Sequence, residues 1–113
     1  MATFSTHVLD SSTGRPAAGL QITVRTAPGT GWAQTVLTTA YTNSDGRVSD
    51  WGMGELSPGS YQLRFGTGDW FAGQDKFCFY PEVLIAFTVD DDDSHYHVPL
   101  LIAPYAYSTY RGS

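Results

Sequence analysis

The chain has 113 residues, of which 42% are hydrophobic and 15% are charged, a balance typical of folded globular proteins rather than disordered ones. At this length we expect residues 1–113 to form a single domain with its own core. The formal net charge of −5 argues against general nucleic-acid binding, which depends on a basic surface. No window approaches the roughly eighteen apolar residues of a membrane-spanning helix, so no membrane partner is expected.

The compartment is predicted from the cysteine count and the two ends of the chain. Cys78 is the single cysteine, so no disulfide forms within the chain, which fits a reducing compartment. The first residues lack the basic region and apolar run of a signal peptide. The final Arg111-Gly112-Ser113 is not a peroxisomal address of the Ser-Lys-Leu type. We expect a cytoplasmic protein, with the peroxisome as the alternative in a eukaryote.

Alternating apolar and polar residues predict strands in the first half of the chain. In the first of them, Ser5, His7 and Leu9 share one face, and in the second Leu20, Ile22 and Val24 point inward. The three strands are expected at residues 4–9, 20–26 and 32–42, with turn signals at residues 10–16, 28–31 and 43–46.

The second half contains further strands and one helical segment. Strands are predicted at residues 61–65 and 83–89, with a short helix at 70–77 between them, weakly capped by Asp69 and ended before Pro81. The acidic residues 90–93 are expected to form a solvated turn. They lack the alternating oxygen ligands and glycine of an EF-hand calcium loop.

The last nineteen residues read as two strands joined by a corner at Ala103-Pro104. Side chains two apart share a strand face. One face of the first strand therefore consists of His95, His97, Pro99 and Leu101. The other face consists of Tyr96, Val98, Leu100 and Ile102 and is expected to join the core. After the corner, Ser108 and Tyr110 share a face. The sequence therefore predicts an all-β, antiparallel β-sandwich of seven to eight strands in two sheets, with one short helix.

The three histidines are the first candidates for chemistry, because imidazole titrates near neutral pH. Taken singly, His7 and His97 are more often structural groups, and His95 beside the acidic turn is interpreted as structural or solvated. A rival interpretation joins His7, His95 and His97 in a zinc site. On the residues alone, Arg47 is an exposed charge after a turn. No Gly-x-Ser-x-Gly nucleophile motif occurs.

Two stretches resemble the two signatures of the transthyretin family. The first runs from His7-Val-Leu-Asp10 to Gly14-Arg-Pro16 and on to Ile22, and the second is Tyr96-His97-Val98-Pro99 with the following residues to Ser108. Tyr110-Arg111-Gly112-Ser113 resembles the ending of the enzyme branch of this family, the 5-hydroxyisourate hydrolases. Ala103 and Ala106 replace the serine and glycine usual in the family, which implies altered packing at most.

The resemblance implies a transthyretin-like sandwich that hydrolyses 5-hydroxyisourate without a metal or organic cofactor. It also implies a homotetramer, a dimer of dimers, with active sites in a channel at the dimer–dimer interface. The implied catalytic residues are His7, Arg47, His97 and Ser113. The implied substrate-binding residues are Ser108, Tyr110, Arg111 and Gly112.

Three other functions remain open. The first is a non-catalytic carrier of small molecules of the thyroid hormone type, as in the hormone-binding branch. The second is a metal-dependent hydrolase. The third is a purely structural sandwich domain of an adhesion type, which leaves the histidines unexplained.

Overall fold

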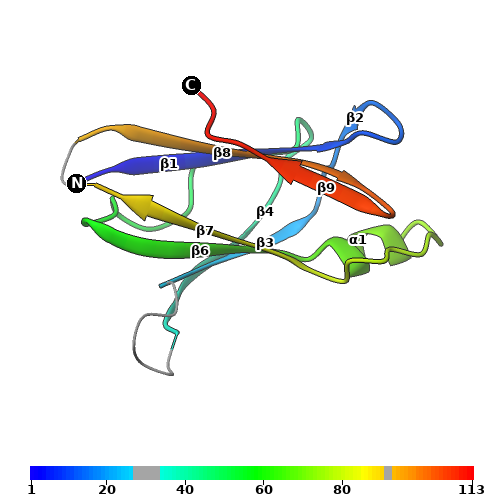
Figure 1. Cartoon of the computed structure of the whole chain (residues 1–113), viewed down its shortest axis with the longest axis horizontal. Coiled ribbons are helices and arrows are strands. Elements are labelled where there is room, and N and C mark those ends of the chain that lie inside the picture. Colours follow the sequence, from blue (N-terminus) through cyan, green and yellow to red (C-terminus); the bar gives the residue numbers. More distant parts are fainter. Residues whose placement is uncertain (27–33, 91–92) are drawn as a thin grey trace.

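The fold is a sandwich of two β-sheets with one short helix at one end (Figure 1). It is seen in a computed structural model that describes residues 1–26, 34–90 and 93–113. The predicted all-β sandwich is confirmed. The described residues form nine strands, because two short strands join those expected from the sequence pattern.

The first sheet has β1 at its centre and holds both histidine-bearing strands. β1 (Thr3–Asp10) pairs on one side with β8 (His95–Ala103), which pairs in turn with β9 (Ala106–Thr109). The two-residue strands β2 (Arg15–Pro16) and β5 (Arg47–Val48) share the other side of β1. The β8–β9 hairpin is antiparallel as predicted, but β1 and β8 run parallel.

The second sheet is antiparallel throughout and lies beneath the first. Its strand order is β4 (Val36–Tyr41), β3 (Gln21–Thr26), β6 (Gly59–Phe65) and β7 (Val83–Val89). The predicted strand 32–42 begins at Val36 among the described residues. Its first two residues, the predicted turn 28–31 and the middle of the acidic turn 90–93 lie outside the described residues.

The core fills the space between the sheets with alternate side chains from both. On β8 the buried residues include Tyr96, Val98, Leu100 and Ile102, as the alternation predicts. β1 contributes Phe4, whose ring stacks on Trp51 at 4.5 Å between centroids. The Trp51 indole N–H donates to the Phe4 carbonyl oxygen at 2.9 Å. The inward faces are thereby fixed, and the intervening residues of β1 and β8 point outward.

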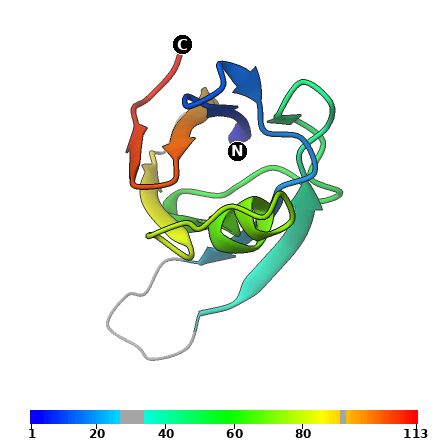
Figure 2. The same ribbon diagram turned by 90° about the vertical axis from the view of Figure 1, so that its right-hand side faces the viewer.

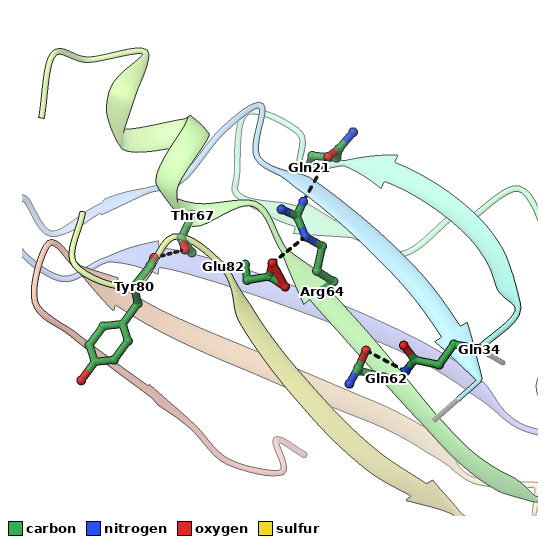
Figure 3. Close-up of polar contacts among 7 residues, drawn as sticks. All are labelled: Gln21, Gln34, Gln62, Arg64, Thr67, Tyr80 and Glu82. Carbon is green, nitrogen blue, oxygen red and sulfur yellow. Dashed lines mark hydrogen bonds and ion pairs between the residues drawn. The ribbon is translucent and has the colours of Figure 1, made fainter. Parts of the chain in front are cut away.

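The helix prediction was right in kind and wrong in position. α1 spans Thr67–Ala72, so it begins three residues before the predicted 70–77 and ends well short of it. Contacts with the returning chain set its start: the Thr67 hydroxyl donates to the Tyr80 carbonyl at 2.8 Å (Figure 3), and the Gly68 N–H donates to the Pro81 carbonyl at 2.8 Å. Asp69 lies inside the first turn and caps nothing.

Side-chain contacts hold the strands of the second sheet together (Figure 3). Arg64 of β6 donates to the Gln21 side chain of β3 at 3.4 Å and lies 3.8 Å from Glu82, which precedes β7. At the other end, Gln34 donates to Gln62 at 3.1 Å. These polar pairs tie β6 to both flanking segments, far from the histidines of the first sheet.

Candidate active site

His7 and Arg47 are brought together by the pairing of β1 with β5, in which they are register partners. Their neighbours Thr6 and Val48 are also partners and are buried, so His7 and Arg47 point outward together. The turn before Arg47 fixes this pairing. Its Gly46 carbonyl accepts from the Val8 N–H at 2.7 Å, and the Arg47 N–H donates to the Asn43 side-chain oxygen at 3.0 Å.

His97 lies on the same outer face, one strand away. The parallel register sets Ser5 opposite His97 and His7 opposite Pro99. His7 and His97 are therefore diagonal neighbours, with Cα atoms about 8 Å apart by the usual strand spacing and rise. Sequence alternation predicted which side chains share a strand face with each imidazole. The parallel pairing of β1 and β8 brings the two faces into one.

Burial and a shared cation favour the neutral form of both imidazoles. Burial lowers the pKa of His7 from its ordinary value of 6.5, and the Arg47 guanidinium lowers it further, against opposing effects of the Asp45 backbone and charge. Burial also lowers the pKa of His97, with added repulsion from Arg47, His7 and His95. Two neutral imidazoles beside a permanent cation can accept protons while an anion is held.

The C-terminal tail continues beyond β9 along the edge of β8 and ends on the outer side of the sheet (Figure 1). Gly112 pairs with His97, and its N–H donates to the His97 carbonyl at 2.9 Å. A Cβ atom on Gly112 would lie 2.5 Å from Cδ2 of the His97 ring, so this close pairing favours glycine. The exposed Ser113 follows Gly112 directly.

The remaining predicted binding residues lie at two different places. The Arg111 guanidinium lies 4.5 Å from the centre of the Tyr96 ring, which is buried on the core side of β8. Arg111, Tyr110 and His97 together line a cavity of about 330 Å³ between β7 and β8. Ser108 pairs with Leu101, four residues along β8 from His97, a distance of roughly 13 Å.

Two further residues lie near His97. Ser5 was not predicted as functional from the sequence, and His95 was interpreted as structural or solvated, or as a ligand in the rival zinc site. The Ser5 hydroxyl lies 2.8 Å from Nδ1 of His97 and 2.8 Å from Nε2 of His95. Ser5 shares the predicted strand face with His7, and His95 shares the predicted strand face with His97. That alternation was the available signal, but no pattern in the sequence places β1 beside β8.

The rival interpretation joins His7, His95 and His97 in a zinc site. Among residues 1–26, 34–90 and 93–113, no group of three His, Cys, Asp or Glu side chains is arranged to hold a metal ion.

In the same residues, no helix has the length and apolar character needed to cross a bilayer.

Comparison of the sequence with known protein families identifies the family of this chain. The profile of the HIUase/Transthyretin family matches residues 4–112, almost the whole chain. The chain belongs to this family. The resemblance seen in the two signature stretches is thereby confirmed.

Relatives from both branches of the family share the fold. The chain is 41% identical over 110 residues to the 5-hydroxyisourate hydrolase of Salmonella typhimurium, covering 96% of this chain and 79% of that protein. The solved 5-hydroxyisourate hydrolase of Klebsiella pneumoniae is 38% identical with a TM-score of 0.88, and all of each chain is covered. Sea bream transthyretin in complex with thyroxine has a TM-score of 0.89, covering 97% and 94%, but only 23% identity. That last likeness shows the fold alone.

Proposed function

We propose that this protein hydrolyses 5-hydroxyisourate. The observation that carries the proposal is the outer face of the first sheet, where strand pairing brings together two imidazoles, a guanidinium and Gly112 of the C-terminal tail. The identity of 41% to a 5-hydroxyisourate hydrolase supports the same activity. The carrier alternative has weaker support, because the transthyretin likeness is one of fold.

The reaction opens a six-membered ring by adding water across a cyclic amide. Water attacks the carbonyl carbon, a histidine takes its proton, the C–N bond breaks, and the nitrogen leaves with a proton. The product is 2-oxo-4-hydroxy-4-carboxy-5-ureidoimidazoline. A general base of this kind contributes roughly 10²–10⁴ in rate. His7 and His97 are the proposed base and its partner, which orients the water or the leaving nitrogen.

The remaining residues of the proposed site stabilise charge and hold the substrate. Arg47 keeps its charge at all pH values near neutrality, so it suits the developing oxyanion. Removal of such a donor typically costs about 3–4 kcal/mol. Ser113 is proposed to hydrogen-bond the substrate or a histidine, with Tyr110, Arg111 and Gly112 completing the terminal motif. The proposed steps need no cofactor. The more distant Ser108 stays a prediction.

We infer that the active form is a homotetramer built as a dimer of dimers. In support, β7 and β9 are the outer strands of their sheets among the described residues and lie on the same side of the sandwich (Figure 2). Outer strands present unpaired backbone groups that favour pairing with another chain. The histidine face is outward-facing in one chain, and assembly would enclose it. The cytoplasmic location stays a prediction.

Ultraviolet spectroscopy tests the proposed activity directly. Urate and urate oxidase generate fresh 5-hydroxyisourate, whose absorbance decays slowly by itself. The protein should accelerate that decay in proportion to its concentration. Decay at the spontaneous rate, together with binding of thyroxine, would reject the hydrolase in favour of the carrier.

A further inference from the structure

A continuous chain of hydrogen bonds runs along the outer face from His97 to the exposed edge of the molecule. The Ser5 hydroxyl lies 2.8 Å from His97 Nδ1 and 2.8 Å from His95 Nε2. The Thr3 hydroxyl lies 2.6 Å from His95 Nδ1. Ser5 is half-buried, whereas Thr3 and His95 are exposed. Hydroxyls and imidazoles therefore alternate from the proposed site to solvent.

When each group donates to the next along the whole chain, the hydrogen bonds can run in either of two directions. A hydroxyl has one proton to donate, and a neutral imidazole has one N–H donor and one acceptor nitrogen. In one direction, His97 Nδ1–H donates to Ser5, Ser5 donates to His95 Nε2, and His95 Nδ1–H donates to Thr3. In the other, every bond is reversed. The direction of the chain thus decides which nitrogen of His97 carries the proton.

The geometry of His97 favours the first direction. Its Nδ1 lies 2.8 Å from the Ser5 hydroxyl, so Nε2 is the ring nitrogen left to face a substrate. In the first direction Nδ1 carries the ring proton, and Nε2 is the unprotonated nitrogen that can accept one. The charged and titratable groups that act on His97 are Arg47 of β5, His7 of β1 and His95 of β8, and each of them disfavours a second proton on the ring.

We propose that Ser5 and His95 are positioning residues that hold His97 in the tautomer protonated at Nδ1. Given the hydrolase activity proposed above, the unprotonated Nε2 of His97 is then the atom that takes the proton from water. The imidazolium so formed keeps its Nδ1–H bond to Ser5, and Nε2 returns the proton to the leaving nitrogen. Neither Ser5 nor His95 touches the substrate.

Nitrogen NMR measures the tautomer without any need for activity. The chain has three histidines, so long-range proton–nitrogen spectra of protein with ¹⁵N-labelled histidine can be assigned by single substitutions. Above the titration range of all three rings, wild-type His97 should be protonated at Nδ1. Ser5→Ala should shift His97 toward the mixed tautomers of a free side chain, and Ser5→Thr should restore it. Ser60→Ala, on an exposed serine of the other sheet, is the matched control and should change nothing.

Kinetics supply the second measurement. Ser5→Ala should lower kcat about tenfold, the size expected from one net hydrogen bond, with KM nearly unchanged. Ser5→Thr should recover kcat. His95→Ala should move the tautomer and kcat in the same direction by less, because Ser5 remains. This exposed variant decides the question if Ser5→Ala does not fold.

The outcomes separate this proposal from the proposed function. A wild-type His97 protonated at Nε2, or a tautomer that neither Ser5→Ala nor His95→Ala changes, would overturn the positioning role. A wild-type protein that leaves 5-hydroxyisourate untouched would reject the hydrolase, while the tautomer spectra still decide the role of Ser5.

Discussion

At the scale of single residues, the outer face of the first sheet combines groups that a monomeric sandwich has no structural reason to place there. His7 and Arg47 are register partners, and His97 lies diagonally across from His7. A guanidinium beside two imidazoles disfavours their protonated forms, so this cluster keeps two bases ready near neutral pH. The proposed chemistry depends on these two neutral rings.

Removing either ring tests its part in the reaction. His97→Asn and His7→Asn should each lower kcat by roughly 10²–10⁴, the contribution of a general base, because asparagine cannot accept the water proton. Stopped-flow ultraviolet assays measure the loss, and sedimentation checks that assembly is unchanged. Near-normal turnover in one variant would remove that histidine from the mechanism.

Removing the guanidinium should change the titration of both imidazoles. Because Arg47 lowers the pKa of His7 and of His97, Arg47→Gln should raise both values, and NMR titration measures them. In the wild type, the acid limb of kcat/KM should lie below pH 6.5, since activity falls as the neutral base is protonated. Arg25→Gln, on β3 of the other sheet, is the control and should leave both values unchanged. Unaltered values in Arg47→Gln would disprove this coupling.

At the scale of elements, a two-residue strand and a tail position the cluster. β5 exists because the turn before it docks on β1. Gly46 has a φ of +73°, and a Cβ atom there would lie 2.4 Å from the Val8 carbonyl oxygen. The tail is held by the pairing of Gly112 with His97 at the edge of β8. Neither element carries its own core, so both depend on contacts with the sheet.

Gly46→Ala should destabilise the fold and displace Arg47. The left-handed backbone conformation costs a residue with a side chain about 1–3 kcal/mol, and the clash with β1 adds to it. Gly52→Ala is the matched control, because its φ is +68° but nothing lies within 4 Å of the added Cβ. Thermal unfolding should show the larger loss for Gly46→Ala. Equal losses of thermal stability in the two variants would mean that the contact between the turn at Gly46 and β1 does not contribute to stability.

Deletion of residues 111–113 should abolish turnover and leave folding nearly intact. The tail pairs with the edge of β8 and contributes no residue to the hydrophobic core, although the Arg111 guanidinium lies over the Tyr96 ring. Circular dichroism and thermal unfolding measure the fold, and the ultraviolet assay measures the activity. A truncated chain that still turns over the substrate would contradict the role proposed for the terminal motif.

At the scale of the whole molecule, the sandwich has open edges at β7 and β9 and large exposed aromatic side chains near them, Tyr80, Tyr105 and Tyr107. Exposed strand edges are commonly covered by pairing with another chain. Aromatic residues are enriched at interfaces between proteins. Together these features support the proposed assembly.

Sedimentation should detect a species four times the 12.3 kDa mass of the chain. If active sites form at the interface between dimers, specific activity should fall on dilution below the dissociation range. The tail-deleted protein provides the inactive reference. A monomer with full specific activity at every concentration would refute the interfacial site.

Period-two alternation was enough to predict what each strand presents to either side. It separates His95 and His97 from Tyr96 and Val98, because burial requires one apolar face per strand. The bounds of β7 and the turn of the closing hairpin followed from the same pattern. The signature stretches and the Tyr-Arg-Gly-Ser ending indicated the family from the sequence alone.

Which residues meet depends on the tertiary structure. Local alternation carries no information about which strands pair. The contact between Ser5 and His97 arises from the parallel pairing of β1 with β8, which the sequence pattern did not indicate. α1 starts at Thr67 and not at the predicted residue 70, because its contacts with residues 80–81 outweigh local helix signals. Strands β2 and β5 are too short to have a pattern of their own and exist through pairing with β1. The register of β1 with β5 and β8 therefore brings the residues of the site together. The sequence pattern indicated only which side chains share a face on each strand.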